Sequence, residues 1–287
     1  LILLAGFVVL SDEQEGNNQL PIDWVSAIIA VMAVGGLTLF LVQGQEWGFS
    51  SPVTLLCLCI SIISTPLLAR RNRTQRHPLF PPAIFAQRSF TIGAAGSALC
   101  QVGFFSIYFG LPLYMREVWS WSPLKIGFAL IPLNVVPLLT AAVAGKIVDR
   151  QGPRPMVIFG GIWSGVSFLI IGFFLMEAGY ILFALGLLVS GLGAMAIGNN
   201  TTIATLLDIE DGLLASASSA SYTARRLGSA LGAVLTASIV GNRLGSDFKD
   251  VYIWVWILGA GAYLLGSLIT YLYYPRRSEQ GLSRSLI

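Results

Sequence analysis

The chain has 287 residues, of which 55% are hydrophobic and only 11% are charged, and its net charge is +3. Soluble domains carry about 25% charged residues, so this composition excludes a water-facing globular surface, and it also excludes intrinsic disorder. The small and scattered positive charge argues against nucleic-acid binding. We therefore expect an all-α, polytopic membrane protein whose first partner is the lipid bilayer.

Apolar segments long enough to cross a bilayer recur along the whole chain. A membrane-spanning helix needs about 20 predominantly apolar residues. Residues 1–10 are apolar but lack both Met and the basic residues that open a signal peptide. We expect them to be the end of a truncated transmembrane helix, so that the sequence would be a fragment. Eight complete spans are expected at residues 24–43, 51–69, 90–115, 124–148, 155–176, 180–206, 223–241 and 252–274.

Lys and Arg are distributed unevenly over the connections between these spans. Thirteen of the 17 fall in one alternating set of connections and four fall in the other. The positive-inside rule places the richer set in the cytoplasm. We therefore expect the 11–23 loop, the basic 70–89 loop and the 275–287 tail to be cytoplasmic in the cell membrane. Tryptophans near expected span ends, among them Trp254 and Trp256, agree with an interfacial aromatic belt.

The longest polar connection divides the expected spans into two groups. Residues 24–69 form a two-helix hairpin, and residues 90–274 contain six spans. The six divide as three and three, and such halves are often repeats in secondary transporters. This division depends on the span count alone.

The strongest motif is the ten-residue string GKIVDRQGPR, which begins at Gly145 and connects two expected spans. Gly145 permits close backbone approach. Asp149 is suited to accept hydrogen bonds from helix N-terminal amides. Gly152 and the proline after it favour a turn, and Arg150 and Arg154 favour the anionic cytoplasmic surface. A generic basic turn is the alternative, but the ordered string favours a specific signature.

This string resembles the cytoplasmic signature of the major facilitator superfamily, G-x-x-x-D-R-x-G-R/P-R/K. Asp23 and Trp24, followed by QEWGF at 45–49, resemble the extra hairpin of the 14-helix drug:proton antiporters in that superfamily. RRLGSALG at 225–232 resembles the start of their second-last helix. The resemblance implies a second six-helix bundle with a two-helix linker hairpin, and a first, N-terminal bundle that is absent.

The resemblance also implies roles for particular residues. The signature loop would latch the missing six-helix bundle, and Arg225 and Arg226 would face the corresponding loop of that bundle. Gly228 and Gly232 lie four residues apart on one helix face, which permits close helix approach. We expect all four residues at the contact between the bundles.

Polar residues within the spans are candidates for a substrate cavity, because polar groups at membrane depth face protein or water. Interhelical hydrogen bonding is the favoured alternative for them. By these span limits, no ionisable residue lies deep inside a complete helix. The candidate cavity residues are Gln101, Asn134, Asn199 and Asn200.

The sequence thus favours a secondary active transporter that exports drugs or other small amphipathic molecules, with proton coupling and alternating access implied by the resemblance. The alternative is a transport-incompetent truncated segment, or a half-transporter that needs a partner bundle. No nucleophile–base pair, metal-ligand spacing or phosphate-binding loop is evident in the sequence, so we expect no enzyme, no cofactor and no metal.

Overall fold

The computed structural model describes residues 23–75, 78–175, 178–197, 200–241 and 248–275, and within these ranges every regular element is a helix. The elements are α2 (Trp24–Trp47), α3 (Pro52–Thr74), α4 (Pro82–Ala86), α5 (Arg88–Glu117), α6 (Pro123–Ala129), α7 (Ile131–Gln151), α8 (Pro153–Ile170), the π-helix η1 (Ile171–Leu175), α9 (Tyr180–Ile197), α10 (Asn200–Leu206), the 3₁₀ helix η2 (Asp211–Leu213), α11 (Leu214–Gly241) and α12 (Phe248–Tyr273). Residues 1–22 and 276–287 lie outside the described residues, and with them the expected segment 1–10 and most of the expected 11–23 loop and 275–287 tail.

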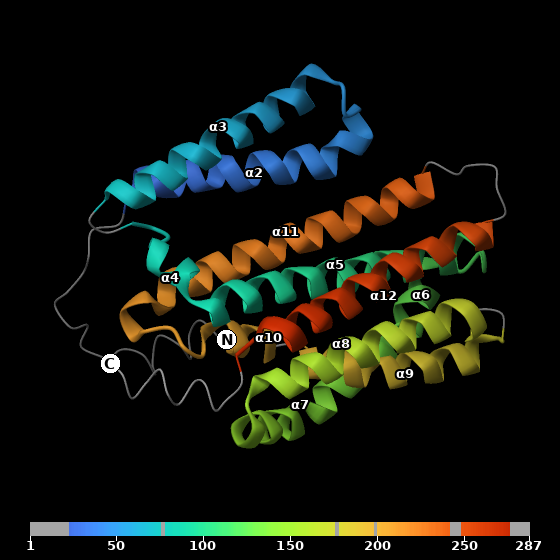
Figure 1. Ribbon diagram of the computed structural model, residues 1–287. Helices are drawn as coiled ribbons and strands as arrows, with labels where there is room; N and C mark the ends of the chain where they lie inside the picture. The colour runs from blue at the N-terminus through green and yellow to red at the C-terminus, as the bar shows by residue number, and fades with distance from the viewer. Residues whose placement is uncertain (1–22, 76–77, 176–177, 198–199, 242–247, 276–287) are drawn as a thin grey trace, which may run out of the picture.

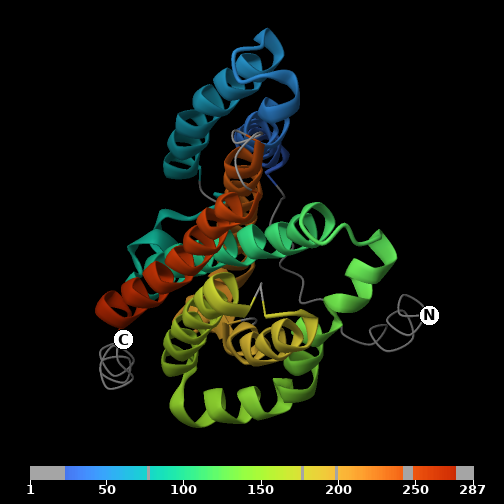
Figure 2. The ribbon, with the colours of Figure 1, turned by 90° about the vertical axis from the view of Figure 1, so that its right-hand side faces the viewer.

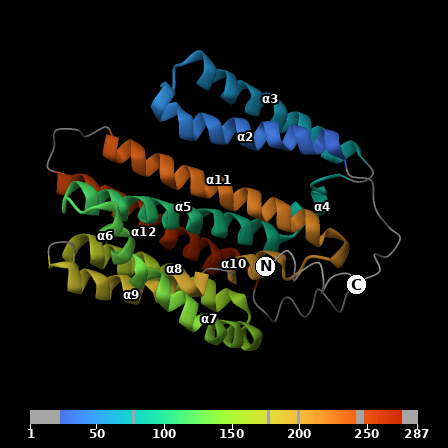
Figure 3. The same cartoon turned by 180° about the vertical axis from the view of Figure 1, so that it is seen from behind.

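The long helices pack side by side around α5 (Figure 1). α5 contacts α11 on one side and α12 on the other, α12 contacts α8, and α9 joins α8 to α7. The view from behind gives the same order (Figure 3). The α2–α3 hairpin lies beside the bundle on the side of α11, and its helix α2 contacts α11 (Figure 2). The expected division of the chain into a hairpin and a six-helix bundle stays a prediction.

The α2–α3 hairpin closes around a small residue and one buried hydroxyl. A Cβ added at Gly36 would lie 2.7 Å from the carbonyl oxygen of Cys57, so glycine permits the backbones to meet there. The buried Ser61 hydroxyl donates to the carbonyl of Ala33 at 2.6 Å. The outer faces carry exposed apolar side chains such as Ile28. A hairpin held by such contacts and apolar outside is suited to a lipid environment.

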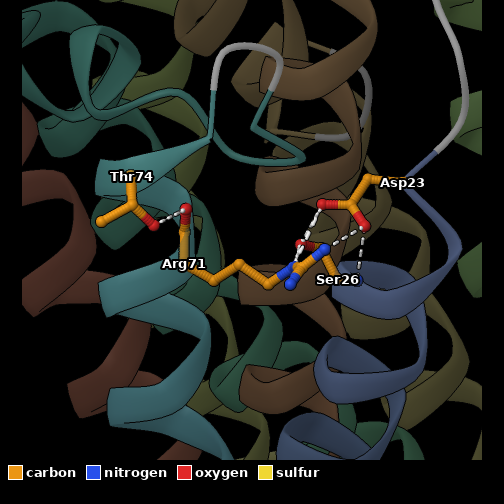
Figure 4. A network of polar contacts seen from close by, with 4 residues as sticks. All are labelled: Asp23, Ser26, Arg71 and Thr74. Atoms are coloured by element: carbon orange, nitrogen blue, oxygen red, sulfur yellow. Dashed lines mark hydrogen bonds and ion pairs between the residues drawn. The ribbon is translucent and has the colours of Figure 1, made fainter.

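An ion pair clasps the two open ends of this hairpin (Figure 4). Arg71 Nη2 lies 3.0 Å from Asp23 Oδ1, and Arg71 Nε donates to Ser26 Oγ at 2.9 Å. Ser26 in turn donates to Asp23 from its amide at 3.1 Å and from its hydroxyl at 2.6 Å, which makes Asp23 the N-cap of α2. Hydrogen bonds from Arg71, and then from Ser26, hold the pKa of Asp23 well below its usual range.

Six helical segments in the described part of the chain are long and apolar enough to cross a membrane: Trp24–Gly44, Pro52–Thr74, Arg88–Glu117, Pro123–Thr140, Pro153–Phe174 and Val251–Tyr273. Within the expected span at 180–206, the structure describes α9 (Tyr180–Ile197) and α10 (Asn200–Leu206), and residues 198–199 lie outside the described residues. The expected 70–89 loop is shorter, since α3 continues to Thr74, α4 lies within the loop, and α5 begins at Arg88.

α11 differs most from its expected span. It begins at Leu214 rather than at residue 223, and it is not among the six apolar spans. Its first half is rich in Ser and Ala, and the polar Ser residues, together with Arg225 and Arg226, lower its mean hydropathy. The short side chains of Ser and Ala also allow tight packing, and Ala217 and Ser221 are buried within the bundle. Packing against neighbouring helices, rather than apolar content, accounts for this helix.

Prolines shape the segment that contains α6 and α7. The expected continuous span breaks at Leu130, which lies between the end of α6 and the start of α7. Pro137 within α7 has no amide hydrogen, so it leaves the carbonyl of Leu133 without its usual intrahelical donor. A Cβ at Gly191 would lie 3.1 Å from that carbonyl oxygen, so α9 approaches α7 at this point.

The placement of Trp256 in an interfacial belt is wrong. Its side chain is fully buried, and a Cβ added to Gly172 in η1 would lie 2.7 Å from its indole ring. Trp254 is 50% exposed and remains compatible with an interfacial position. Side chains two positions apart on a helix point to nearly opposite sides. One of these tryptophans therefore faces outward, and the other lies in the core.

Candidate functional site

The GKIVDRQGPR string forms the tight connection that its composition predicts. α7 ends at Gln151, Gly152 has φ +79°, and α8 begins at Pro153. Positive φ is readily adopted only by glycine, and proline is favoured in the first helical turn. The Gly152 amide donates to the carbonyl of Val148 at 2.7 Å, which closes the end of α7. The string thus reverses the chain direction within one residue.

Arg154 fixes this turn to the far end of α12. Its Nη2 donates to the carbonyl of Tyr271 at 2.7 Å, and its guanidinium lies 6.0 Å from the centre of the Tyr271 ring. An arginine at a helix C-terminus is favourable because that end carries partial negative charge. The turn and α12 together line an open cleft of about 420 Å³.

The other charged residues of the string face outward. Asp149 and Arg150 are exposed in the last turns of α7, and so is Gly145. Within the described residues, neither residue has the expected contact. A Cβ added at Gly145 would meet no described atom within 4 Å, and the structure shows no hydrogen bond from the described amides of α8 to Asp149, so both roles stay predictions. Asp149 lies at the C-terminal end of its helix, where amide donors are already paired.

Gly228 and Gly232 make contacts inside the bundle, and the expected contact between bundles stays a prediction. A Cβ at Gly228 would clash with the carbonyl oxygen of Ala98 on α5, and one at Gly232 would clash with that of Val102. Ser106 Oγ also donates to the carbonyl of Gly232 at 3.2 Å. The two glycines therefore join α11 to α5 by close backbone approach.

Arg225 lies deep within its helix because α11 begins early. It comes eleven residues after Leu214, which is about 16 Å along the helix axis. The side chain is half-buried, and its Nη1 donates to Thr202 Oγ1 at 2.5 Å. Arg226 is exposed. Arg225 therefore lies further from the start of its helix than the expected span at 223–241 implied.

The candidate cavity residues do not form one cluster of open polar groups. Gln101 Nε2 donates to Ser229 Oγ at 3.3 Å, across the α5–α11 contact. Asn200 is buried and donates to the carbonyl of Ala196 at 2.9 Å. Asn134 is exposed and donates to the carbonyl of Leu130 at 3.2 Å. Asn199 lies outside the described residues. The bond of Gln101 favours the alternative of interhelical hydrogen bonding, whereas that of Asn200 is local, to a residue four positions earlier.

The Asp23–Arg71 clasp and the depth of Arg225 are the features that sequence analysis missed. The sequence does contain a signal for the clasp: an acid precedes the first helix of the hairpin, and an arginine lies near the end of the second. These two positions lie close together because the start of the first helix and the end of the second meet at the open end of a two-helix hairpin. The signal for Arg225 is weaker, since nothing in the composition of residues 214–222 marks them as helical.

The Major Facilitator Superfamily is the family that matches this chain, over residues 93–285. The chain is 23% identical to the tetracenomycin C resistance and export protein of Streptomyces glaucescens over 86% of its own length and 46% of that relative. It is 24% identical to multidrug export protein EmrB of Escherichia coli strain K12, over 84% of this chain and 48% of the relative. It is 28% identical to EmrB of Haemophilus influenzae, over 85% and 48% respectively. The chain spans about half the length of these curated relatives.

Proposed function

Because this chain belongs to the Major Facilitator Superfamily of transporters, we propose that it acts in the export of drugs or other small amphipathic molecules. The observation that carries the proposal is the outward-facing signature turn, in which Asp149 and Arg150 are exposed. The turn lies within residues 93–285, the part of the chain that matches the family. The names of three relatives, which are export proteins, support the direction of transport and the substrate class.

The proposed mechanism is alternating access by rocking of two bundles about a central cavity. The six-helix part of this chain is one of them, and α2 and α3 form the linker hairpin. Close contact through Gly228 and Gly232 supports movement of α5 and α11 as one body, since backbone packing of this kind does not deform continuously. The proposed partner is a first six-helix bundle that carries the proton-coupling residues.

The signature turn is the proposed latch to that partner bundle. The exposed end of α7 carries an acid, a base and a glycine that has no side chain, at Asp149, Arg150 and Gly145. Arg154 fixes the turn to α12. The positive-inside distribution supports a cytoplasmic location for this turn and for the C-terminus, with the protein in the cell membrane.

Dye accumulation in an efflux-deficient bacterium tests the proposal. Cells that express the complete encoded protein should retain less dye than control cells, and Asp149→Asn should restore retention without lowering the melting temperature. Glu210→Gln, another exposed acid in a connection assigned to the same side, is the matched control and should leave efflux unchanged. Equal dye retention with and without the protein would instead support a segment that needs a separate partner bundle to transport.

A further inference from the structure

An open cleft of about 580 Å³ lies between the end of α3 and the short helix α4, near the open end of the hairpin (Figure 1). Contacts outside the cleft hold both of its walls. On one side, Arg71 ties α3 to Asp23. On the other side, Ile84 of α4 is fully buried, and Thr91 Oγ1 of α5 donates to the carbonyl of Phe85 at 2.8 Å. The cleft is therefore bounded by helices that are fixed in place.

The polar end of the cleft has a buried amide next to a guanidinium. Asn72 and Arg73 both line the cleft, near the end of α3. The Asn72 side chain is only 9% exposed, and its Oδ1 has no hydrogen-bond partner among the described residues. A buried polar group without a partner is unfavourable. Asn72 would therefore gain from a ligand that forms hydrogen bonds with its amide.

The rest of the cleft is mainly apolar. Leu68 lies one turn before Asn72 on the same face of α3, and Phe80 and Phe85 line the cleft from the side of α4. From Thr65 to Asn72 the cleft follows α3 for about 10 Å along the helix axis. A groove of this length, polar at one end and apolar along the rest, matches an amphipathic ligand.

The order of these groups along α3 matches the order of groups in a membrane leaflet. Arg71 and Arg73 lie in the last turn of α3, and the positive-inside distribution supports a cytoplasmic location for this end. The cytoplasmic leaflet contains anionic phospholipids, and basic pockets at this level bind their headgroups. A phospholipid there has its phosphate at the membrane surface and its acyl chains toward the bilayer centre. Arg73 and Leu68 follow the same order.

We propose that this cleft binds an anionic phospholipid with a hydroxylated headgroup, of the phosphatidylglycerol type. Arg73 binds the phosphate through charge-assisted hydrogen bonds. The headgroup hydroxyl pairs with Asn72, since a hydroxyl donates to an amide oxygen and accepts from an amide nitrogen. One acyl chain lies along Leu68 and Phe85. The inference does not depend on the proposed export function, because this site lies between α3 and α4 whether or not the chain transports a drug.

Native mass spectrometry of the complete encoded protein in detergent tests this proposal. The protein is titrated with three phospholipids that share the same acyl chains. Phosphatidylglycerol is the proposed ligand, phosphatidylethanol has the same charge without a hydroxyl, and phosphatidylcholine has neither a net charge nor a hydroxyl. Phosphatidylglycerol should bind about tenfold more tightly than phosphatidylcholine and about threefold more tightly than phosphatidylethanol.

Two substitutions in the cleft and one matched control locate the site. Arg73→Gln should weaken phosphatidylglycerol binding about tenfold, because the charge-assisted bonds to the phosphate are lost. Arg70→Gln removes an equal charge from an exposed position outside the lining of the cleft and should change this binding less than about twofold. Asn72→Leu keeps the size of the side chain and should lower the affinity for phosphatidylglycerol to that for phosphatidylethanol.

Equal affinities of the unmodified protein for phosphatidylglycerol and phosphatidylcholine would overturn the proposal. Equal losses in Arg70→Gln and Arg73→Gln would also overturn it, because the lipid would then be attracted by the basic surface as a whole. If Asn72→Leu weakens binding of phosphatidylglycerol and phosphatidylethanol alike, the assignment of the hydroxylated headgroup is wrong. If Asn72→Leu does not fold, Asn72→Ala decides by the same comparison.

Discussion

Replacing Gly232 by alanine tests whether α5 and α11 depend on backbone contact. The added Cβ would clash with the carbonyl oxygen of Val102 and lie 3.1 Å from its carbonyl carbon. A backbone group cannot rotate away as a side chain does, so the helices must separate. Two hydrogen bonds across this contact would then be strained: Ser106 Oγ donates to the carbonyl of Gly232 at 3.2 Å, and Thr236 Oγ1 donates to the carbonyl of Ser106 at 3.3 Å. Overpacking of this kind costs about 1–3 kcal/mol.

Thermal unfolding of the purified protein in detergent measures this cost. A loss of that size corresponds to a fall of roughly 3–10 °C in melting temperature for a chain of this length. Gly261→Ala is the matched control, because a Cβ at this helical glycine would meet no described atom within 4 Å. It should be neutral or should raise the melting temperature slightly, since alanine favours the helix. Equal melting temperatures for Gly232→Ala and Gly261→Ala would refute the reasoning.

Two further predictions concern the helix ends. Arg71→Gln should lower the melting temperature at pH 7 more than Arg70→Gln, a change at an exposed neighbour. The pKa of Asp23 is lowered in the folded protein, so the clasp contributes fully above the ordinary aspartate pKa of about 4 and is lost gradually as the pH falls from there toward the lowered pKa. The difference in melting temperature between Arg71→Gln and the unmodified protein should therefore be constant above about pH 4 and should narrow progressively below it, and a difference that does not narrow in acid would contradict this account. Tyr252→Phe removes a 2.6 Å hydrogen bond to Glu117 Oε2 and should cost about 1 kcal/mol in chemical unfolding, whereas no loss would show that solvent replaces the bond.

Helix positions with strong apolar content were predictable from the sequence. The spans at 24–43 and 51–69 correspond to α2 and α3, and the turn at Gly152 lies where the motif placed it. The physical reason is that lipid requires an uninterrupted apolar helix, and glycine followed by proline limits the backbone to a turn.

Features that depend on tertiary packing were not predictable. The start of α11 at Leu214 follows from small residues that pack against neighbouring helices, and a single sequence does not show which helix they meet. The same limit applies to Gly228 and Gly232, whose spacing predicted a close contact but not its partner, α5. The Asp23–Arg71 clasp joins residues 48 positions apart, and only the fold brings them together.

Transport by the complete protein in proteoliposomes tests the central claim most directly. A pH gradient is imposed across the membrane, and movement of a fluorescent amphipathic dye is followed with and without nigericin, which dissipates the gradient. We predict that the dye moves against its own concentration gradient only while the pH gradient lasts, and that Asp149→Asn abolishes this movement. Dye movement that is independent of the pH gradient, or that Asp149→Asn does not change, would contradict the account.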